Sequence, residues 1–409
     1  MQRKAGLLAL LALLALLALV SGIAILATVA PGRAAAAASC DGQWQVVSTD
    51  DHSPLSGEID GLNAVAALAS GDQWAVGTWA HFPDAYSFHT LIERWDAATN
   101  AWTLVPSPNT AALNNHLYGV AAVASDDAWA VGGSDDFSAY NTLVEHWDGT
   151  SWSIVPAASF PGVLYAVAAL GPEDVWAVGS ENYPGRGLIE HWNGTTWTAT
   201  YLRFNALLRG VTAVGPRTVW AVGQRYGRRN PFGDTTLTMR FNGSAWLPVR
   251  SPNPLSGNDT DQNWLTSVSA VSANDLWAVG RYGNHDLGPL DQTLIEHWNG
   301  ASWTVVPTPN PGGSSVDNDL WGVVAVGAGD VWAVGGVGAF LNPQFSSPLT
   351  LHWDGSKWSE APVSAPVTGE LFGVAAEPTG AGISAVGDTI KPALPDPYVG
   401  TLAEHLCPG

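Results

Sequence analysis

The sequence predicts an all-β fold, a seven-bladed β-propeller of four-stranded antiparallel blades. Three observations predict it. A Trp-Ala-Val-Gly phrase recurs about every 50 residues, which is a period typical of propeller blades. Asp-Gly or Asn-Gly dipeptides follow five of the seven phrases at the place where a tight hairpin is needed. The last copy lacks one strand, and the segment from residue 40 supplies a strand of that kind.

The phrase marks the second strand of every blade. Complete copies begin at six tryptophans, and a degraded seventh copy begins with serine: Trp74, Trp129, Trp176, Trp220, Trp277, Trp332 and Ser384. Most of the 21 tryptophans fall at repeating positions, so we interpret them as packing residues between neighbouring units.

The other strands are read from the same repeats. Leu117–Val123 is typical of a first strand, Thr293–Trp298 of a third and Ser302–Val306 of a fourth. Turns such as Asp148-Gly149 tolerate the positive φ of a type I′ hairpin. No segment shows a helical period long enough for the crossovers of a parallel α/β sheet.

The ends of the chain predict how the ring closes. The seventh repeat stops at Thr401–Cys407, and Cys40–Val47 reads as a fourth strand without the first three. We therefore expect the N-terminal strand to complete the last blade. Cys40 and Cys407, which are the only cysteines, would then share the hairpin position, and we predict a disulfide between them.

Residues 1–39 form a separate segment before the propeller domain of residues 40–409. Arg3 and Lys4 precede an apolar run over Ala5–Ala30 and an alanine-rich exit, as in a cleaved secretory signal peptide. The run is also long enough for a retained membrane anchor, and Cys40 leaves a lipoprotein open. All three alternatives predict a secreted or extracellular domain, in two of them anchored to the outer face of the cytoplasmic membrane.

The charge restricts the partners. The net charge is −20, and all acidic residues lie beyond residue 39. We expect no nucleic acid partner, because phosphate binding needs a basic surface. A membrane would be a partner only through residues 1–39, if they are retained.

The repeats resemble the kelch and WD-repeat propellers of secreted bacterial proteins over residues 40–409. Gly132-Gly133 and Gly335-Gly336 match the glycine pair that ends the second kelch strand, and the downstream Trp of each turn fits as well. The Asp/Asn-Gly-x-x-Trp turns are also similar to the Asp-box of sialidases, without its upstream Ser and spacing. The resemblance implies a propeller fold and no particular activity.

Loop lengths predict where ligands bind. Connections from second to third strands and from blade to blade are long and varied, and both emerge on one face, which we name the loop-rich face. Scaffolded loops usually carry binding. The residue after the repeated Leu of each first strand should ring the channel mouth there: Asn63, Tyr118, Tyr165, Arg209, Thr266, Trp321 and Phe372. These side chains would stack on a sugar or flat ligand, or else wedge between blades.

A second candidate on the loop-rich face is basic. Residues 200–250 contain eight arginines and one acid, and the loop with Arg225, Arg228 and Arg229 should project there, beside Arg281. Arginine forks suit carboxylate, sulfate or phosphate; a solvated patch and self-association are the alternatives. Trp79 and Trp264 lie outside the repeating positions and complete the candidate binding residues.

Catalytic and metal ligands are not predicted. The Glu-His pairs, such as Glu145-His146, recur once per blade on adjacent strand positions that face opposite ways, so we interpret them as structural. No cofactor is expected, although Asn258–Asp261 and Asp317–Asp319 offer oxygens to Ca²⁺ without a recognised spacing. We expect a non-enzymatic scaffold for a protein or carbohydrate ligand. A glycan-acting enzyme (sialidase-like hydrolase, lyase or galactose-oxidase-like) and a structural cell-surface component are the alternatives.

The predicted disulfide between Cys40 and Cys407 has a direct test. Mass spectrometry of the exported protein under non-reducing conditions should find Cys40 and Cys407 in one linked peptide pair. The loop-entropy model gives up to about 4–5 kcal/mol of stabilisation for so large a loop, so reduction should lower the melting temperature. A free or lipidated Cys40 would contradict the prediction.

Overall fold

The computed structural model describes most of the chain beyond residue 42: residues 43–51, 58–81, 87–137, 140–158, 161–182, 185–227, 233–258, 260–284, 290–338, 346–361, 363, 367–380, 382–391 and 398–406. The predicted signal or anchor of residues 1–39 lies outside these ranges. In the described ranges no helix has the length and apolar character needed to cross a membrane.

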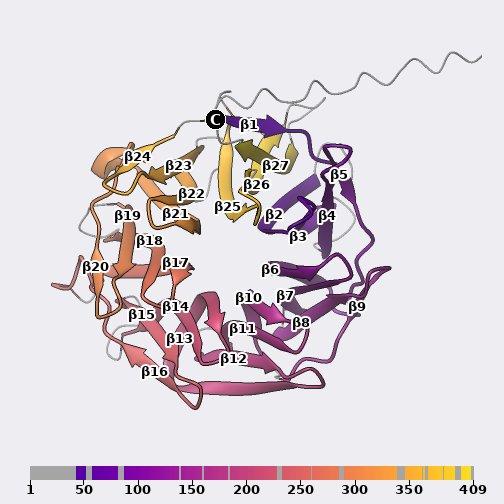
Figure 1. The fold of residues 1–409 in the computed structure, drawn as a ribbon, viewed down its shortest axis with the longest axis horizontal. Helices are drawn as coiled ribbons and strands as arrows, with labels where there is room; N and C mark the ends of the chain where they lie inside the picture. Colours follow the sequence, from indigo (N-terminus) through magenta and orange to yellow (C-terminus); the bar gives the residue numbers. More distant parts are fainter. Residues whose placement is uncertain are drawn as a thin grey trace, which may run out of the picture. The chain divides into compact units, whose positions relative to one another are not determined.

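Seven antiparallel blades surround a central channel, as predicted (Figure 1). The first strands face the channel and are β2 (Glu58–Ala67), β6 (Asn114–Ala124), β10 (Val163–Gly171), the second half of β13 (Trp197–Gly215), β17 (Gln262–Ser272), β21 (Asp317–Gly327) and β25 (Gly369–Ala376). The second strands are β3 (Gln73–His81), β7 (Asp127–Asp135), β11 (Asp174–Ser180), β14 (Thr218–Tyr226), β18 (Asp275–Gly283), β22 (Asp330–Gly338) and β26 (Ile383–Lys391).

The outer strands complete the blades. The third strands are β4 (Phe88–Asp96), β8 (Tyr140–Trp147), β12 (Arg186–Trp192), β15 (Asp234–Phe241), β19 (Gln292–Trp298), β23 (Ser347–Trp353) and β27 (Tyr398–Leu406). The fourth are β5 (Ala101–Leu104), β9 (Trp152–Ile154), the first half of β13, β16 (Trp246–Val249), β20 (Trp303–Val305), β24 (Trp358–Glu360) and β1 (Trp44–Val47). β13 runs unbroken from blade 3 into blade 4, so the long connection found between other blades is missing there.

The ring closes as the sequence predicts. β1 pairs antiparallel with β27, with Trp44 opposite Leu406, and lies outside it in Figure 1. The chain that follows β1 is held by Asp51, whose carboxylate accepts hydrogen bonds from the amide and hydroxyl of Thr401 at 2.9 and 2.8 Å. Cys40 and Cys407 lie outside the described residues, so their disulfide stays a prediction.

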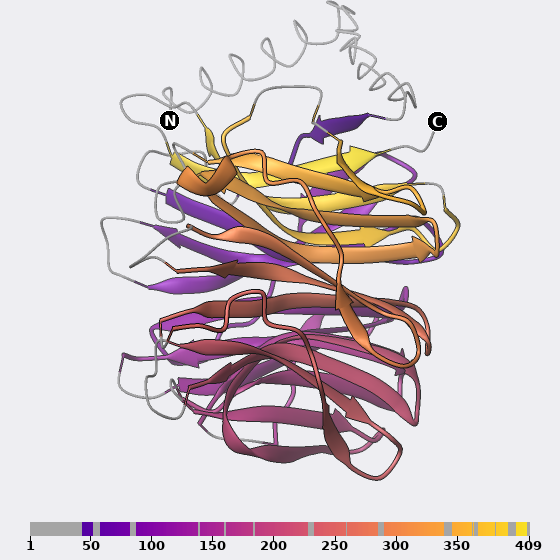
Figure 2. The same ribbon diagram turned by 90° about the vertical axis from the view of Figure 1, so that its left-hand side faces the viewer.

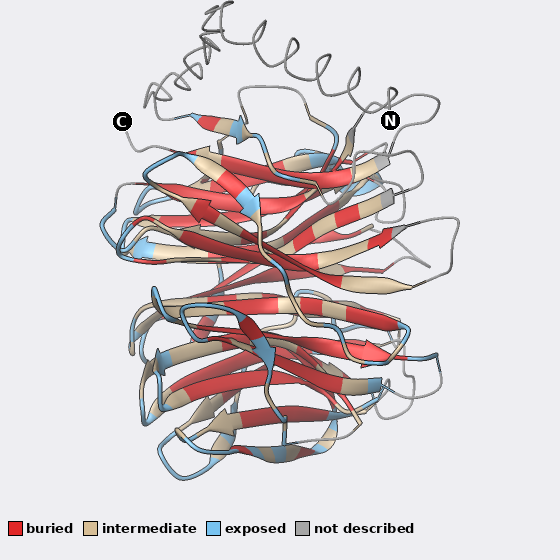
Figure 3. Ribbon diagram, turned by 90° about the vertical axis from the view of Figure 1, so that its right-hand side faces the viewer, coloured by how far each residue is buried: buried red, intermediate tan, exposed pale blue. Residues whose placement is uncertain are grey.

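Tryptophans fill the interfaces between blades. Trp74 of blade 1 meets Trp147 and Trp152 of blade 2, with ring centroids 4.9 and 5.2 Å apart. The same arrangement joins blades 2 and 3, 4 and 5, and 5 and 6. Edge-on views show the stacked blades and the buried strand interiors (Figures 2 and 3). Most of the repeating tryptophans are therefore core residues.

A second repeated contact joins an aspartate and a histidine beside the tryptophan of the second strand. The Nε2 atom of His146 is 2.9 Å from Oδ1 of Asp127, and its ring packs on Trp129 at 4.3 Å. Three more blades repeat this His-Asp contact, while Arg94 takes the place of histidine opposite Asp72 in blade 1. These aspartates thus hold the third strand, and the histidines are structural.

Each first strand contains a β-bulge at one repeated position. In blade 5, Leu265 pairs with Gly280 and Ser267 with Val279, so Thr266 is the extra residue. The other six first strands skip the residue after the repeated Leu in the same way. A methyl group added at Gly280 would lie 1.9 Å from the carbonyl oxygen of Trp264. The glycine of Trp-Ala-Val-Gly is required because the bulged backbone crosses directly over it.

Replacing one such glycine tests this requirement. Gly280→Ala should lower the free energy of unfolding by at least about 2 kcal/mol, because the bulge must move. Gly215→Ala is the matched control, since no atom lies within 4 Å of its added methyl group, and should stay within about 1 kcal/mol of wild type. Equal denaturant midpoints for the two variants would contradict the assignment.

Buried glutamates recur on the third strands. Glu145 and Glu296 are fully buried, and each accepts a hydrogen bond from one serine, Ser107 at 3.0 Å and Ser251 at 2.6 Å. Burial raises the pKa of both carboxyls to about 8, although the serine hydroxyls oppose the shift. No cation pairs with either carboxyl among the described residues, so both remain protonated at neutral pH.

This burial predicts a stability that falls as pH rises. Glutamates of the unfolded chain lose their protons near pH 4.3, whereas the folded protein retains them until about pH 8. The melting temperature should therefore decrease as pH rises from about 4.3 to about 8, between the unfolded and folded pKa values of these carboxyls. In Glu145→Gln/Glu296→Gln the decrease should be smaller, because glutamine mimics the protonated acid. Identical pH profiles would refute the role of these carboxyls.

Candidate functional site at the channel mouth

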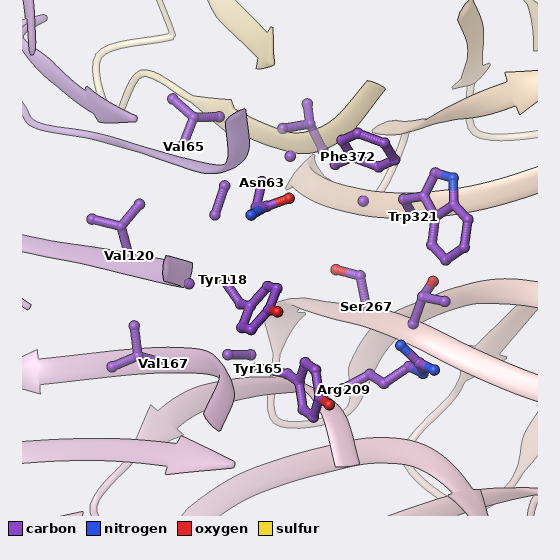
Figure 4. Close-up of a pocket in the computed structure, with 18 of the residues that line it drawn as sticks. Asn63, Val65, Tyr118, Val120, Tyr165, Val167, Arg209, Ser267, Trp321 and Phe372 are labelled. Carbon is purple, nitrogen blue, oxygen red and sulfur yellow. The ribbon is translucent and has the colours of Figure 1, made fainter. Parts of the chain in front are cut away.

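The seven bulges bring the predicted ring of side chains to the channel mouth. A cavity of about 180 Å³ opens between the first strands, and all seven bulged residues line it. Tyr118, Tyr165, Arg209, Trp321 and Phe372 surround its centre in Figure 4. The next residue of each strand is small in every blade, and the added methyl group of Gly119 would lie 2.9 Å from Ala166 Cα of the next blade. Bulges thus supply the side chains, and small residues let the strands approach.

Two of the seven side chains tie blades together. Asn63 Nδ2 donates to the carbonyl of Leu117 at 2.8 Å, and Thr266 Oγ1 donates to that of Leu320 at 2.7 Å. Each of these carbonyls belongs to the next blade. At these two positions the side chain therefore lies between blades, which is the second of the two alternatives predicted for the ring of residues.

An aromatic and cationic arc runs around the rest of the mouth. Tyr118 packs on Tyr165, with ring centroids 5.3 Å apart. The guanidinium carbon of Arg209 lies 5.8 Å from the Tyr165 centroid and 5.6 Å from that of Trp264. The arc continues through Arg281 to Trp321 and Phe372. Neighbouring side chains of the arc therefore support one another, and stacking of a sugar on these rings stays a prediction.

Arg281 is a structural centre of the arc. Its side chain is only 5% exposed, and Nη1 lies 2.9 Å from Asp319 Oδ1 and 3.3 Å from Asp291 Oδ2. Trp264 covers it at 4.2 Å. Burial raises the pKa of Asp319 to about 6, while Arg281 opposes the shift. The expectation that Arg281 meets an anionic ligand is therefore corrected, because two carboxylates already hold it.

Carboxylates also fix both tryptophans of the arc. Trp264 Nε1 donates to Asp234 at 2.9 Å, and Trp321 Nε1 donates to Glu370 at 3.0 Å. Burial raises the pKa of Asp234 to about 6 and that of Glu370 to about 7, although the indole donors oppose it. The two indoles are therefore held in place at the rim.

Arg209 differs from Arg281. Its Nε donates to Gln224 at 3.3 Å, and Gln224 in turn donates to Asp234 at 3.0 Å. Among the described residues no carboxylate forms an ion pair with Arg209. Burial lowers the pKa of its guanidinium, although Tyr165 opposes the shift, and the group keeps its charge at neutral pH. Gln224 thus links the arginine to Asp234 through its side-chain amide.

Hydroxyl groups accompany Arg209 in the cavity. Tyr118, Tyr165 and Ser267 line it, and within the described ranges none of their hydroxyls has a hydrogen-bond partner in the protein. Burial raises the pKa of both tyrosines, so they remain protonated donors. No acidic residue lines the cavity.

The other predicted residues lie elsewhere. Trp79 stacks on His89 at 4.5 Å in blade 1 and does not line the cavity. Arg225 lies 4.5 Å from the Phe204 ring. Arg228 and Arg229 fall outside the described residues. Among the described arginines of blade 4, Arg240 covers the interface ring of Trp220 instead of joining Arg225.

Sequence reasoning missed Gln224 and Ser267. Gln224 directly follows the glycine of its repeat, and Ser267 follows the bulged residue by one. Both positions vary between blades, and that variation was the available signal.

Two of the carboxylates proposed for Ca²⁺ have partners in the protein, and Asp259 lies outside the described residues. Asp261 accepts backbone hydrogen bonds from Gly257 and Asn258 at 2.7 and 2.8 Å, and Asp319 pairs with Arg281. No group of three or more acidic, histidine or cysteine side chains is placed to hold a metal in the part of the chain that is described.

Comparison with known proteins shows the fold. No family model and no curated protein matches the sequence. A structure described as YCF48 bound to D1 peptide, a β-propeller, has a TM-score of 0.54 and 14% identity, covering 89% of this chain and 95% of that one. A component of a mitotic checkpoint complex has a TM-score of 0.50 and 11% identity, covering 87% and 97%.

An α-L-arabinanase of Penicillium chrysogenum with arabinobiose has a TM-score of 0.49 and 13% identity, covering 88% and 98%. Identities this low show likeness of fold alone. The chain is therefore a β-propeller, and its function must be argued from its own site.

Proposed function

We propose that this chain is an exported, non-enzymatic propeller of the kelch or WD type that binds a carboxylate-bearing partner protein at the channel mouth. The observation that carries the proposal is the cavity lining. It contains Arg209 and three hydroxyl donors but no acid, in a chain whose net charge is −20.

The donors suit one carboxylate. A guanidinium presents a planar fork of N–H groups, and charge-assisted hydrogen bonds strengthen where water is partly excluded. Gln224 bridges Arg209 and Asp234, and the two charged groups form no direct ion pair. The site therefore has charge, donors and space for an incoming anionic group.

The fold is compatible with a peptide ligand. The similar propeller YCF48 is described as bound to a peptide, which concerns that protein and supports only that such a scaffold presents peptide sites. Residues 1–39 would direct the domain out of the cytoplasm. It would then be secreted, or be held at the outer face of the cytoplasmic membrane by that segment alone.

A glycan-acting enzyme fits the cavity less well. Most glycoside hydrolases use a pair of carboxyl groups flanking the scissile bond, and this lining contains none. A purely structural surface component would have no need of an arginine kept apart from the protein's own acids.

Arg209→Gln tests the proposal. We expect binding of the full chain to arrays of carboxylate-bearing peptides and glycans to fall about tenfold or more, because a charge-assisted contact is lost. Arg217→Gln is the matched control: it removes an exposed arginine of the same blade from the turn between first and second strands, on the opposite face. Thermal melts establish that both variants are folded. Unchanged binding by folded Arg209→Gln would refute the proposal.

A further inference from the structure

We infer that the group held in the cavity is the free C-terminal carboxylate of a partner polypeptide, which enters end first along the channel axis. This inference rests on the proposed function and specifies its ligand. Four features of the mouth support it: the size of the cavity, its closed wall, the charge of its rim and the packing of its aromatic rings.

The cavity is small for a complete ligand. It measures about 180 Å³, whereas pockets for drug-sized molecules measure about 300–1,000 Å³, and a cavity of about 150 Å³ takes one benzene. The space therefore suits one residue at the end of a longer chain.

The wall is closed on all sides. First strands of adjacent blades approach so tightly that a methyl group at Gly373 would lie 2.7 Å from Ala64 Cα of blade 1, which is the junction closed by the chain ends. Gly119 approaches Ala166 of the next blade, and Gly210 approaches Ser267 of the next blade, about as closely. A strand cannot enter laterally, so a ligand must present a terminus or the tip of a turn.

The rim favours one isolated charge. Asp234, Asp319 and Glu370 hold the tryptophans and Arg281 at the mouth. A segment with several acids would place like charges beside these carboxylates, which is unfavourable. A C-terminus with neutral last residues brings one carboxylate to Arg209 and no other negative charge.

The aromatic packing favours a peptide over a sugar. Arg209 lies over Tyr165, and Arg281 over both Trp264 and Trp321, so one face of each of these rings is engaged within the protein. The accessible groups are the Arg209 fork and the hydroxyls of Tyr118, Tyr165 and Ser267, which together can donate to both oxygens of a carboxylate.

The test uses three series of fluorescent heptapeptides with the same neutral sequences. One series has a free C-terminal acid, the second a C-terminal amide, and the third an amide with a single internal glutamate. For the full chain, the acids should bind about tenfold or more tightly than their amides, the effect of one charged contact. Arg209→Gln should remove this preference, Tyr165→Phe should weaken it with the ring retained, and Arg217→Gln should leave it unchanged.

The outcomes separate the two proposals. Internal-glutamate amides that bind as tightly as the acids, still through Arg209, would overturn end-first recognition and leave carboxylate binding intact. Preference for uronate-ended oligosaccharides through Arg209 would overturn the peptide ligand. Binding independent of Arg209 in every series, or no binding to any carboxylate probe, would overturn the proposed function as well.

Discussion

The bulge opposite a glycine, repeated in each blade, determines how the channel of this propeller is built. At Gly280 the backbone of the neighbouring first strand passes where a Cβ atom would otherwise lie, and the extra residue, Thr266, is displaced toward the mouth. A regular antiparallel pair would send alternate side chains into the two blade interfaces. The bulge adds a third direction, so a strand whose sides are committed to packing can still present one side chain to a ligand.

The blade interfaces make that position free to vary. Trp74, Trp147 and Trp152 show the contact that joins neighbouring blades, and such buried aromatic surface dominates the packing energy. Since the tryptophan contacts do not involve the bulged residue, this residue can bond to the next blade in one position, as Asn63 does, and bring a cation to the cavity in another, as Arg209 does.

Two arginines at the channel mouth differ in the side chains that surround them. Arg281 is buried with Asp291 and Asp319, where removing one partner would leave uncompensated charge. Arg209 has Gln224 between itself and Asp234. One arginine thus builds the arc, and the other remains available to an anion. A neutral amide at one strand position makes that difference.

The sequence by itself determined the blade count, the strand order and the closure by β1, because the Trp-Ala-Val-Gly repeats and the Asp/Asn-Gly turns are local signals that recur in register. It also identified the seven positions at the channel mouth, since each follows a repeated leucine. Only the tertiary structure decided what they do: the burial of Arg281 and the engagement of Trp264 depend on residues from other strands and neighbouring blades. Local patterns specify a blade, whereas the charge and accessibility of a site arise from contacts between blades, which no single repeat encodes.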